Sequence, residues 1–147
     1  MNTLQVPQLG TRTDGRIVQL FGEIRPPAFA PLLQVDKNYA LEILSVFFNY
    51  DATGVPAVQV GLYAQAQGVD IIKRRSALVI TVAGGNEVQM TQGQGFDALA
   101  LANSLSIGLG RIIIPPEGFL TPLITNDQVG DTIDSFCVIG IAWPVTR

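Results

Sequence analysis

The sequence predicts an all-β fold, an antiparallel β-sandwich of about eight strands. Two observations indicate it. Apolar and polar residues alternate in short segments. In residues 57–64, Val58, Val60 and Leu62 alternate with Gln59, Gly61 and Tyr63, which is typical of a strand with one buried face. Turn signals separate such segments about every 8–12 residues, a spacing that favours a sandwich over a parallel α/β sheet.

The strand pattern defines a sandwich domain over residues 36–147. One long strand is expected at 40–50, with one face formed by Leu44, Val46, Phe48 and Tyr50. The longest is expected at 132–145, with one face formed by Ile133, Cys137, Ile139, Ile141 and Trp143. Shorter strands are expected at 57–64, 69–73, 76–82, 87–91, 105–109, 112–114 and 119–125.

Two connections have their own signals. Residues 83–86, Ala-Gly-Gly-Asn, predict a hairpin turn, because glycine supplies the positive φ that such turns need. Residues 93–104 interrupt the alternation and contain Ala and Leu, which favour a helix by propensity. We expect a short helix or a loop there, with Asp97 as a possible N-cap.

Residues 1–35 are expected to form an extended N-terminal arm with a possible short strand at 16–22. The apolar residues of the first fifteen positions follow no period. Prolines within residues 25–33 exclude a helix interior or a central strand, because proline lacks a backbone donor. This part of the chain is therefore expected to run along a surface.

The composition argues for assembly or binding and against catalysis. The chain has no histidine, one cysteine, nine Lys and Arg and twelve Asp and Glu among 147 residues. Most enzymes need a group that titrates near neutral pH, a tuned carboxylate pair or a metal. Charged residues make up 14 % of the chain, against a usual ~25 %. Because interface cores are depleted of charge, much of the surface is expected to be covered by other subunits.

Charge and hydropathy also limit which classes of partner are possible. A net charge of −3 argues against nucleic acid, which requires a basic face, and the one basic run, residues 73–75, suits a solvated turn. No apolar run reaches the ~18 residues of a membrane span, and the N-terminus has no signal-peptide pattern. A single cysteine excludes an internal disulfide, so Cys137 is expected to be a buried small hydrophobe.

Two motifs suggest ligands, and each has a simpler interpretation. Residues 93–98, Gly-Gln-Gly-Phe-Asp-Ala, match the G-x-G-x-x-A dinucleotide fingerprint, but the preceding strand alternates and no βαβ unit follows, so a flexible loop is favoured. An acidic group suggests calcium, although a polar turn between strands has the same composition. Its members are Asn126, Asp127, Asp131 and Asp134.

Two further residue sets leave alternatives open. Four glutamates, Glu23, Glu42, Glu87 and Glu117, are potential glycosidase carboxylates, but nothing in the sequence brings two of them together. Four aromatic residues, Tyr39, Tyr50, Tyr63 and Trp143, are a potential sugar-stacking platform, although Trp143 is expected in the core. We expect no catalytic residue, no metal and no cofactor.

The order of these elements resembles the small jelly-roll virion proteins of tailed bacteriophages that decorate or cement the capsid. The resemblance covers about residues 39–145. It rests on the strands 39–50, 58–62 and 76–82, the segment Ile114-Pro-Pro-Glu-Gly-Phe119, and the run from Gly130 to Trp143. It implies a jelly-roll sandwich without catalytic residues, bound to a capsid or trimeric. It also implies an arm that reaches over neighbouring subunits, here with candidate interface residues Leu4, Val6, Pro7, Leu9, Pro26, Pro27 and Phe29.

From the residues and this resemblance we expect a head decoration or cement protein. Its partners would be copies of itself, as a homotrimer, and the major capsid protein. It would be assembled in the host cytoplasm and located on the capsid surface of the virion. The alternative is a receptor- or glycan-binding jelly-roll head of a phage fibre or spike, which would expose an aromatic site ringed by polar groups.

Overall fold

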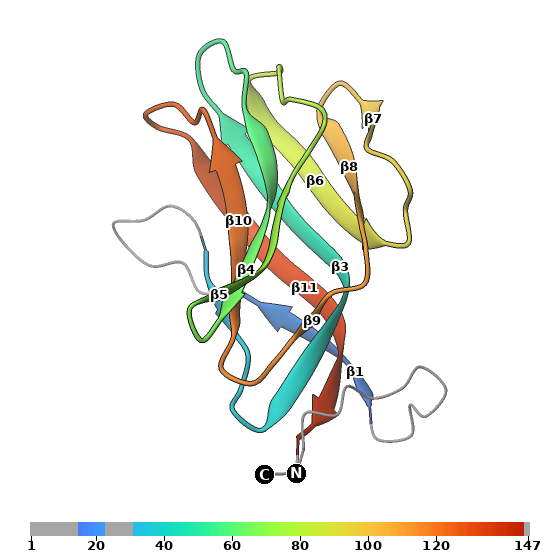
Figure 1. Ribbon diagram of the computed structural model, residues 1–147. Helices are drawn as coiled ribbons and strands as arrows, with labels where there is room; N and C mark the ends of the chain where they lie inside the picture. The colour runs from blue at the N-terminus through green and yellow to red at the C-terminus, as the bar shows by residue number, and fades with distance from the viewer. Residues whose placement is uncertain (1–14, 23–30, 146–147) are drawn as a thin grey trace.

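The computed structural model describes residues 15–22 and 31–145. It is an all-β sandwich of two packed sheets, with no helix in the described residues (Figure 1). The strands are β1 (Arg16–Phe21), β2 (Leu33–Gln34), β3 (Tyr39–Ala52), β4 (Gln59–Ala66), β5 (Val69–Arg75), β6 (Gly84–Gln92), β7 (Ala98–Leu101), β8 (Ser104–Leu109), β9 (Ile113–Ile114), β10 (Phe119–Thr125) and β11 (Thr132–Pro144). The all-β sandwich predicted from the alternation is confirmed.

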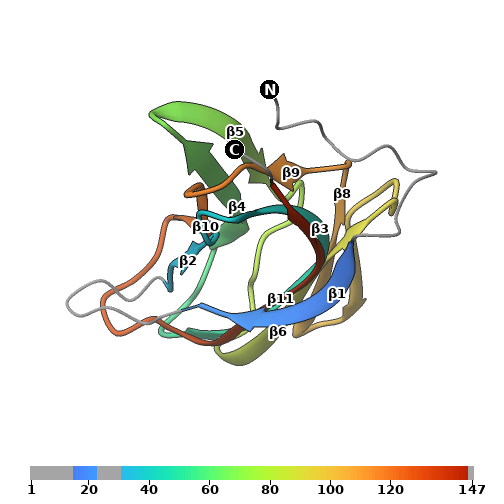
Figure 2. The same ribbon diagram turned by 90° about the horizontal axis from the view of Figure 1, so that it is seen from below.

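The larger sheet has seven strands. Six follow the order β1-β11-β3-β6-β8-β7, and the seventh, β9, pairs with the first part of β3, ahead of the part that pairs with β6. The smaller sheet has the order β2-β10-β4-β5. Viewed from below, the larger sheet curves around the smaller one (Figure 2). The jelly-roll connectivity stays a prediction, because this strand order does not establish it.

The expectation of a purely antiparallel sandwich was wrong at one pair of strands. β8 runs parallel to β6, while all other pairs are antiparallel. The chain passes from β6 to the outer strand β7 and returns through a turn at residues 102–103 into β8. β7 runs opposite to β6, and the turn into β8 reverses the chain again, so β8 runs in the same direction as β6.

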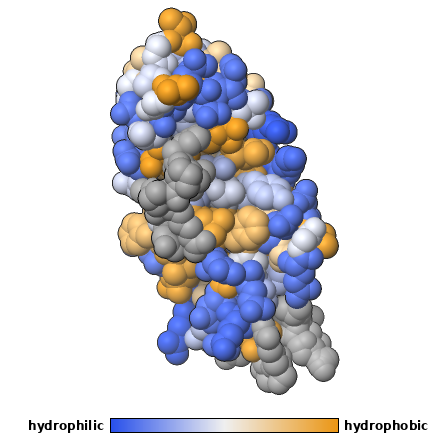
Figure 3. All heavy atoms as spheres, turned by 90° about the vertical axis from the view of Figure 1, so that its left-hand side faces the viewer, coloured by the Kyte–Doolittle hydropathy of each residue, from blue (hydrophilic) through white to orange (hydrophobic). Residues whose placement is uncertain are grey.

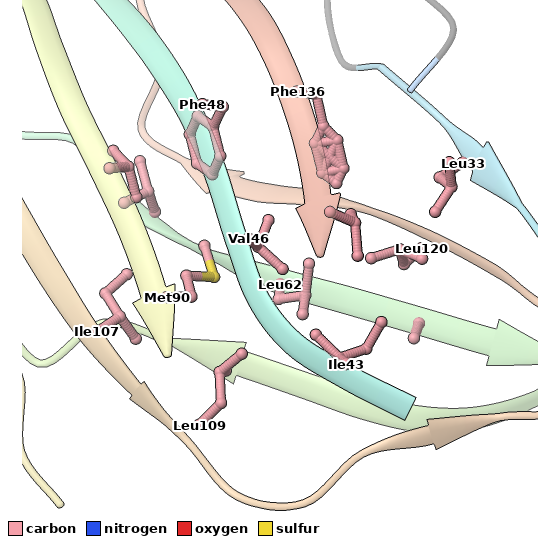
Figure 4. Close-up of a cluster of buried hydrophobic side chains, with 14 of the residues drawn as sticks. Leu33, Ile43, Val46, Phe48, Leu62, Met90, Ile107, Leu109, Leu120 and Phe136 are labelled. Carbon is pink, nitrogen blue, oxygen red and sulfur yellow. The ribbon is translucent and has the colours of Figure 1, made fainter. Parts of the chain in front are cut away.

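The core lies between the two sheets (Figure 4). Val58, Val60 and Leu62 of β4 and its flank are fully buried, as their alternation predicted. Leu120 of the adjacent β10 belongs to the same sheet. These side chains pack in one cluster with Val46, Phe48, Met90 and Ile107 of the larger sheet, and Figure 4 shows Leu62 and Leu120 among them. The Phe48 and Phe136 rings contact each other at a centroid distance of 6.2 Å. Burial of this apolar surface stabilises the fold at ~25 cal/mol per Å².

Two β-bulges changed the predicted faces of the long strands. Leu44 is an extra residue of β3 opposite β11, so Ile43 and Val46 both face the core and Leu44 does not continue their face. A second extra residue lies at Ser135 in β11, whose φ is 59°. A bulge shifts the alternation by one residue. Phe136 and Val138 therefore face the core with Ile133, whereas Cys137, Ile141 and Trp143 are buried outside the core cluster.

One predicted strand and two predicted connections also differ. Residues 76–82 form no strand; they cross from β5 to β6, and only Ile80 makes a bridge, to Val58. Leu78 and Ile80 still point inward, which explains the strand-like pattern. Of the expected hairpin turn at 83–86, residues 84–86 are the beginning of β6. The expected helix or loop at 93–104 contains β7, because pairing with β8 overrides the helix propensity of Ala and Leu.

The segment expected as an arm contributes a strand to each sheet. β1, within the predicted 16–22, pairs along its whole length with β11, and β2 pairs with β10. The candidate arm residues Leu4, Val6, Pro7, Leu9, Pro26, Pro27 and Phe29 lie outside the described residues. Within 15–22 and 31–145, no helical segment reaches the length and hydropathy that a membrane crossing requires.

Candidate functional site

The Asp131 carboxylate joins the end of β3 to the turn before β11. Tyr50 Oη donates to Oδ2 at 2.5 Å, and the Gln128 backbone N–H donates to the same oxygen at 2.9 Å. The Thr53 backbone N–H and hydroxyl both donate to Oδ1 at 2.8 Å. Burial alone would raise the pKa of Asp131, but these hydrogen bonds outweigh it and lower the pKa to about 2. Both oxygens are thus used in holding the turn together.

A second carboxylate, Asp97, ties the two sheets together at the β5–β8 side. It accepts hydrogen bonds from the backbone N–H groups of Ala77 at 2.7 Å and Gly108 at 3.0 Å. Its Oδ1 also lies 2.6 Å from Arg74 Nη2, and Arg74 Nε donates to the Gly108 carbonyl. Burial opposes ionisation, yet these donors hold the pKa of Asp97 below its usual value. Asp97 is a link between sheets and not a helix cap.

The residues that suggested ligands do not converge on one site. The Gly93–Ala98 fingerprint lies between two strands and opens no helix. Asp131, the buried member of the acidic group, has both oxygens bonded within the chain. Across the described part of the chain, no group of three or more His, Cys, Asp or Glu side chains is arranged to hold a metal ion.

The candidate carboxylates are also separated. Glu42 is fully buried on β3, where its oxygens contact Gln92 Nε2 at 3.1 Å and Arg111 Nη2 at 3.5 Å. Glu87 lies opposite Asn49, seven residues further along β3 and thus roughly 23 Å from Glu42. Glu117 lies in the turn before β10, and Glu23 falls outside the described residues.

The four aromatic candidates are likewise dispersed. Tyr50 and Trp143 are buried, so neither offers a stacking surface. Tyr63 on β4 donates to Asp70 Oδ1 at 2.6 Å, and Tyr39 is exposed at the start of β3. The predicted burial of Trp143 is confirmed, although its place is beside Gly15 and Ile141 and not between the sheets.

Exposed apolar side chains gather at the two edges of the larger sheet. Of the eleven large hydrophobic residues that are exposed within 15–22 and 31–145, five lie on or beside the edge strands: Ile17 and Phe21 on β1, and Phe96, Leu99 and Leu101 on or just before β7. Their exposed fractions range from 45 % to 77 %. Figure 3 shows a different side, the left of Figure 1, where hydrophobic patches are separated by hydrophilic ones. Apolar exposure of this kind at sheet edges is typical of an interaction surface.

A hollow of about 690 Å³ opens between the edges of the two sheets at β1 and β2. Its apolar lining includes Val18 and Leu20 of β1 and Leu33 and Val35 at β2, with Arg16 among its polar residues. On the opposite side of the sandwich, the Arg74–Asp97 cluster links the sheet edges. One side of the sandwich is therefore closed by hydrogen bonds and an ion pair between the sheets, and the other side has an open hollow.

A second, smaller hollow of about 310 Å³ lies on the larger sheet around Phe47. Phe47 is partly exposed, and polar side chains from its own strand β3 and from β6, β8 and β11 surround it. These are Asn49, Glu87, Gln89, Ser104 and Ser135. Phe47 was not among the aromatic residues that the sequence suggested, since its position on the solvent side of β3 depends on which face the core occupies.

The comparisons with known proteins add no relative. No protein-family model matches the chain, and searches of curated proteins and of solved structures find no match.

Proposed function

We propose that this chain is a non-enzymatic structural protein that functions by assembly. The observation that carries the proposal is the apolar exposure at both edges of the seven-stranded sheet, in a chain that is only 14 % charged. A second observation supports it: the buried carboxylates Asp97 and Asp131 are engaged in structural hydrogen bonds. Groups used in this way hold the fold and offer no free acid or base.

The specific form that we propose is a decoration or cement protein on the capsid surface of a tailed bacteriophage. Its partners would be further copies of itself, as a homotrimer, and the major capsid protein. The mechanism would be mechanical. A subunit that spans a boundary between capsomers buries apolar surface on both sides, at ~25 cal/mol per Å², and an interface above ~1,000 Å² repeated around a shell stabilises it. The arm residues Leu4, Val6, Pro7, Leu9, Pro26, Pro27 and Phe29 are proposed to add contacts.

The mass of the purified full chain in solution tests the assembly function. We expect multi-angle light scattering to give a trimer or a larger closed assembly at micromolar concentration, because the exposed edges are poorly suited to remain in water. A single-chain mass of 15.7 kDa that persists up to millimolar concentration would contradict the proposal.

The Phe47 hollow favours a second candidate function, recognition of a glycan. A sugar ring stacks on an aromatic face while hydroxyl groups bond to surrounding polar side chains, and Phe47 with Asn49 and Gln89 provides both. Here we expect binding on a glycan array that Phe47→Ala abolishes. The matched control is Tyr39→Ala, an exposed aromatic at the other end of β3. An array without any binding would remove this candidate.

A further inference from the structure

The two edges of the larger sheet are opposite ends of one hydrogen-bonded ladder. β1 pairs only with β11, and β7 pairs only with β8 among the described residues. In Figure 1, β1 lies at the bottom of the molecule and β7 at the upper right. An edge strand presents unpaired N–H and C=O groups that can pair with a strand of another chain. A copy could therefore offer either edge without covering the other.

The two edges match in chemistry as well as in backbone. β7 is Ala-Leu-Ala-Leu, and residues 98–110 contain no charged side chain. β1 exposes Ile17 and Phe21 on the sheet face that points away from the core. Leu101 is opposite Ser104, the neighbour of the buried Leu105, and so lies on the outer face of its own sheet. Pairing of β7 with β1 would bring Leu101 to the same face as Ile17 and Phe21, so apolar surface would be covered on both partners.

The hollow beside β1 fits the same arrangement. A strand that continued the larger sheet beyond β1 would point alternate side chains to the inner side, where Val18, Leu20 and Leu33 line the 690 Å³ hollow. Leu99 is opposite the buried Leu105 and so lies on the core side of its own sheet. In a continued sheet, a leucine on this side would enter the neighbour's hollow.

The smaller sheet provides a contrast. One of its two edge strands is the two-residue β2, Leu-Gln; the other, β5, is Val-Asp-Ile-Ile-Lys-Arg-Arg and carries four charged residues in seven. Charged side chains on an edge oppose pairing with another chain. The larger sheet has one arginine on β1 and no charge on β7, so its edges lack this protection.

We propose that β7 of one copy pairs with β1 of the next, so that copies join head to tail into one continuous sheet. This inference rests on the proposed assembly function and names the partner as a second copy of this chain. The contact is heterologous, because two different surfaces meet, and such contacts close into rings when the rotation between copies allows it. Phe21 on β1 and Phe96 just before β7 are both exposed at these edges. A phenylalanine buries ~150–250 Å², so the two together supply a substantial share of the ~1,200–2,000 Å² in a stable interface.

Two double variants of the full chain test the pairing. Leu99→Glu with Leu101→Glu blocks the β7 edge, and Ile17→Glu with Phe21→Glu blocks the β1 edge. All four side chains are exposed, so the fold is expected to persist, which circular dichroism checks. The control is Val55→Glu with Val129→Glu, two fully exposed apolar residues away from both edges. We expect each edge variant to be monomeric by sedimentation, with at least a tenfold weaker contact, and the control to assemble as the wild type.

An equimolar mixture of the two edge variants distinguishes this pairing from any other interface. One variant keeps an intact β1 and the other an intact β7, so the mixture has one working contact and is expected to give a mass of two chains. A mixture that stays monomeric, or edge variants with the wild-type mass, would overturn the pairing and leave assembly through another surface in place. A wild-type chain that is itself monomeric would count against the assembly function as well.

Discussion

Replacement of Asp131 by asparagine is expected to lower the free energy of unfolding by about 3 kcal/mol and Tm by about 10 °C. The carboxylate accepts four hydrogen bonds, from Tyr50 Oη, the Thr53 N–H and hydroxyl, and the Gln128 N–H. An asparagine keeps one oxygen and turns an NH₂ group towards donors, so at least two buried donors lose their acceptor. Thermal unfolding at pH 7 measures the loss.

Asp127→Asn is the matched control, because Asp127 is an exposed acid in the same turn. It removes the same charge without removing a buried acceptor, so we expect Tm to change by less than about 2 °C. Equal losses in the two variants would show that charge, and not the hydrogen-bond cluster, stabilises the turn.

The same residue predicts the acid sensitivity of the fold. The pKa of Asp131 is about 2 in the folded chain against an ordinary value of 3.8. Because the folded state binds this proton less readily, its stabilising effect is complete above pH ~4 and is lost as the pH falls through about 2. Denaturant unfolding between pH 5 and 2 should show a smaller pH slope for Asp131→Asn than for the wild type. Asp97, whose pKa is also lowered, accounts for part of the slope that remains.

The elements that sequence predicted well are those whose signal is local. The alternation in β4 was interpreted correctly, because this strand has one face towards the core. The bulges at Leu44 and Ser135 could not be read, since a bulge is a mismatch between two strands and each strand alone looks regular. The predicted faces of β3 and β11 were consequently right on one side of each bulge and wrong on the other.

The polar contacts were harder to predict than the strands, because they join residues that are far apart in the sequence. Asp97 bonds to residues 11 to 23 positions away, and Asp131 to a tyrosine 81 positions away. The sequence identified Asp131 only as one of several acids in a turn. For β7, the helix propensity of Ala and Leu led to the wrong expectation of a helix or loop. The lack of charge in residues 98–110 was a signal that this segment could pair at a sheet edge.

Gly61→Ala is expected to destabilise the sandwich by at least 3 kcal/mol, because a methyl group has no space at this position. Gly61 lies in β4 opposite Arg75 of β5. A Cβ atom there would contact the Arg74 carbonyl oxygen and lie 2.8 Å from the Arg74 carbonyl carbon and 2.9 Å from the Arg75 Cα. These are backbone atoms, so no side-chain rotation relieves the contact, and β5 must move away from β4.

The consequence extends beyond the strand pair, because β5 carries Arg74. If β5 moves, the Arg74–Asp97 contact that ties the smaller sheet to β8 is weakened with it. Gly85→Ala is the matched control: Gly85 is also a strand glycine, in β6, and a Cβ atom there meets nothing within 4 Å. We expect Gly85→Ala to keep the wild-type Tm or to raise it slightly, since alanine reduces the entropy of the unfolded chain. Similar Tm values for the two variants would show that β4 and β5 are less closely packed than the structure indicates.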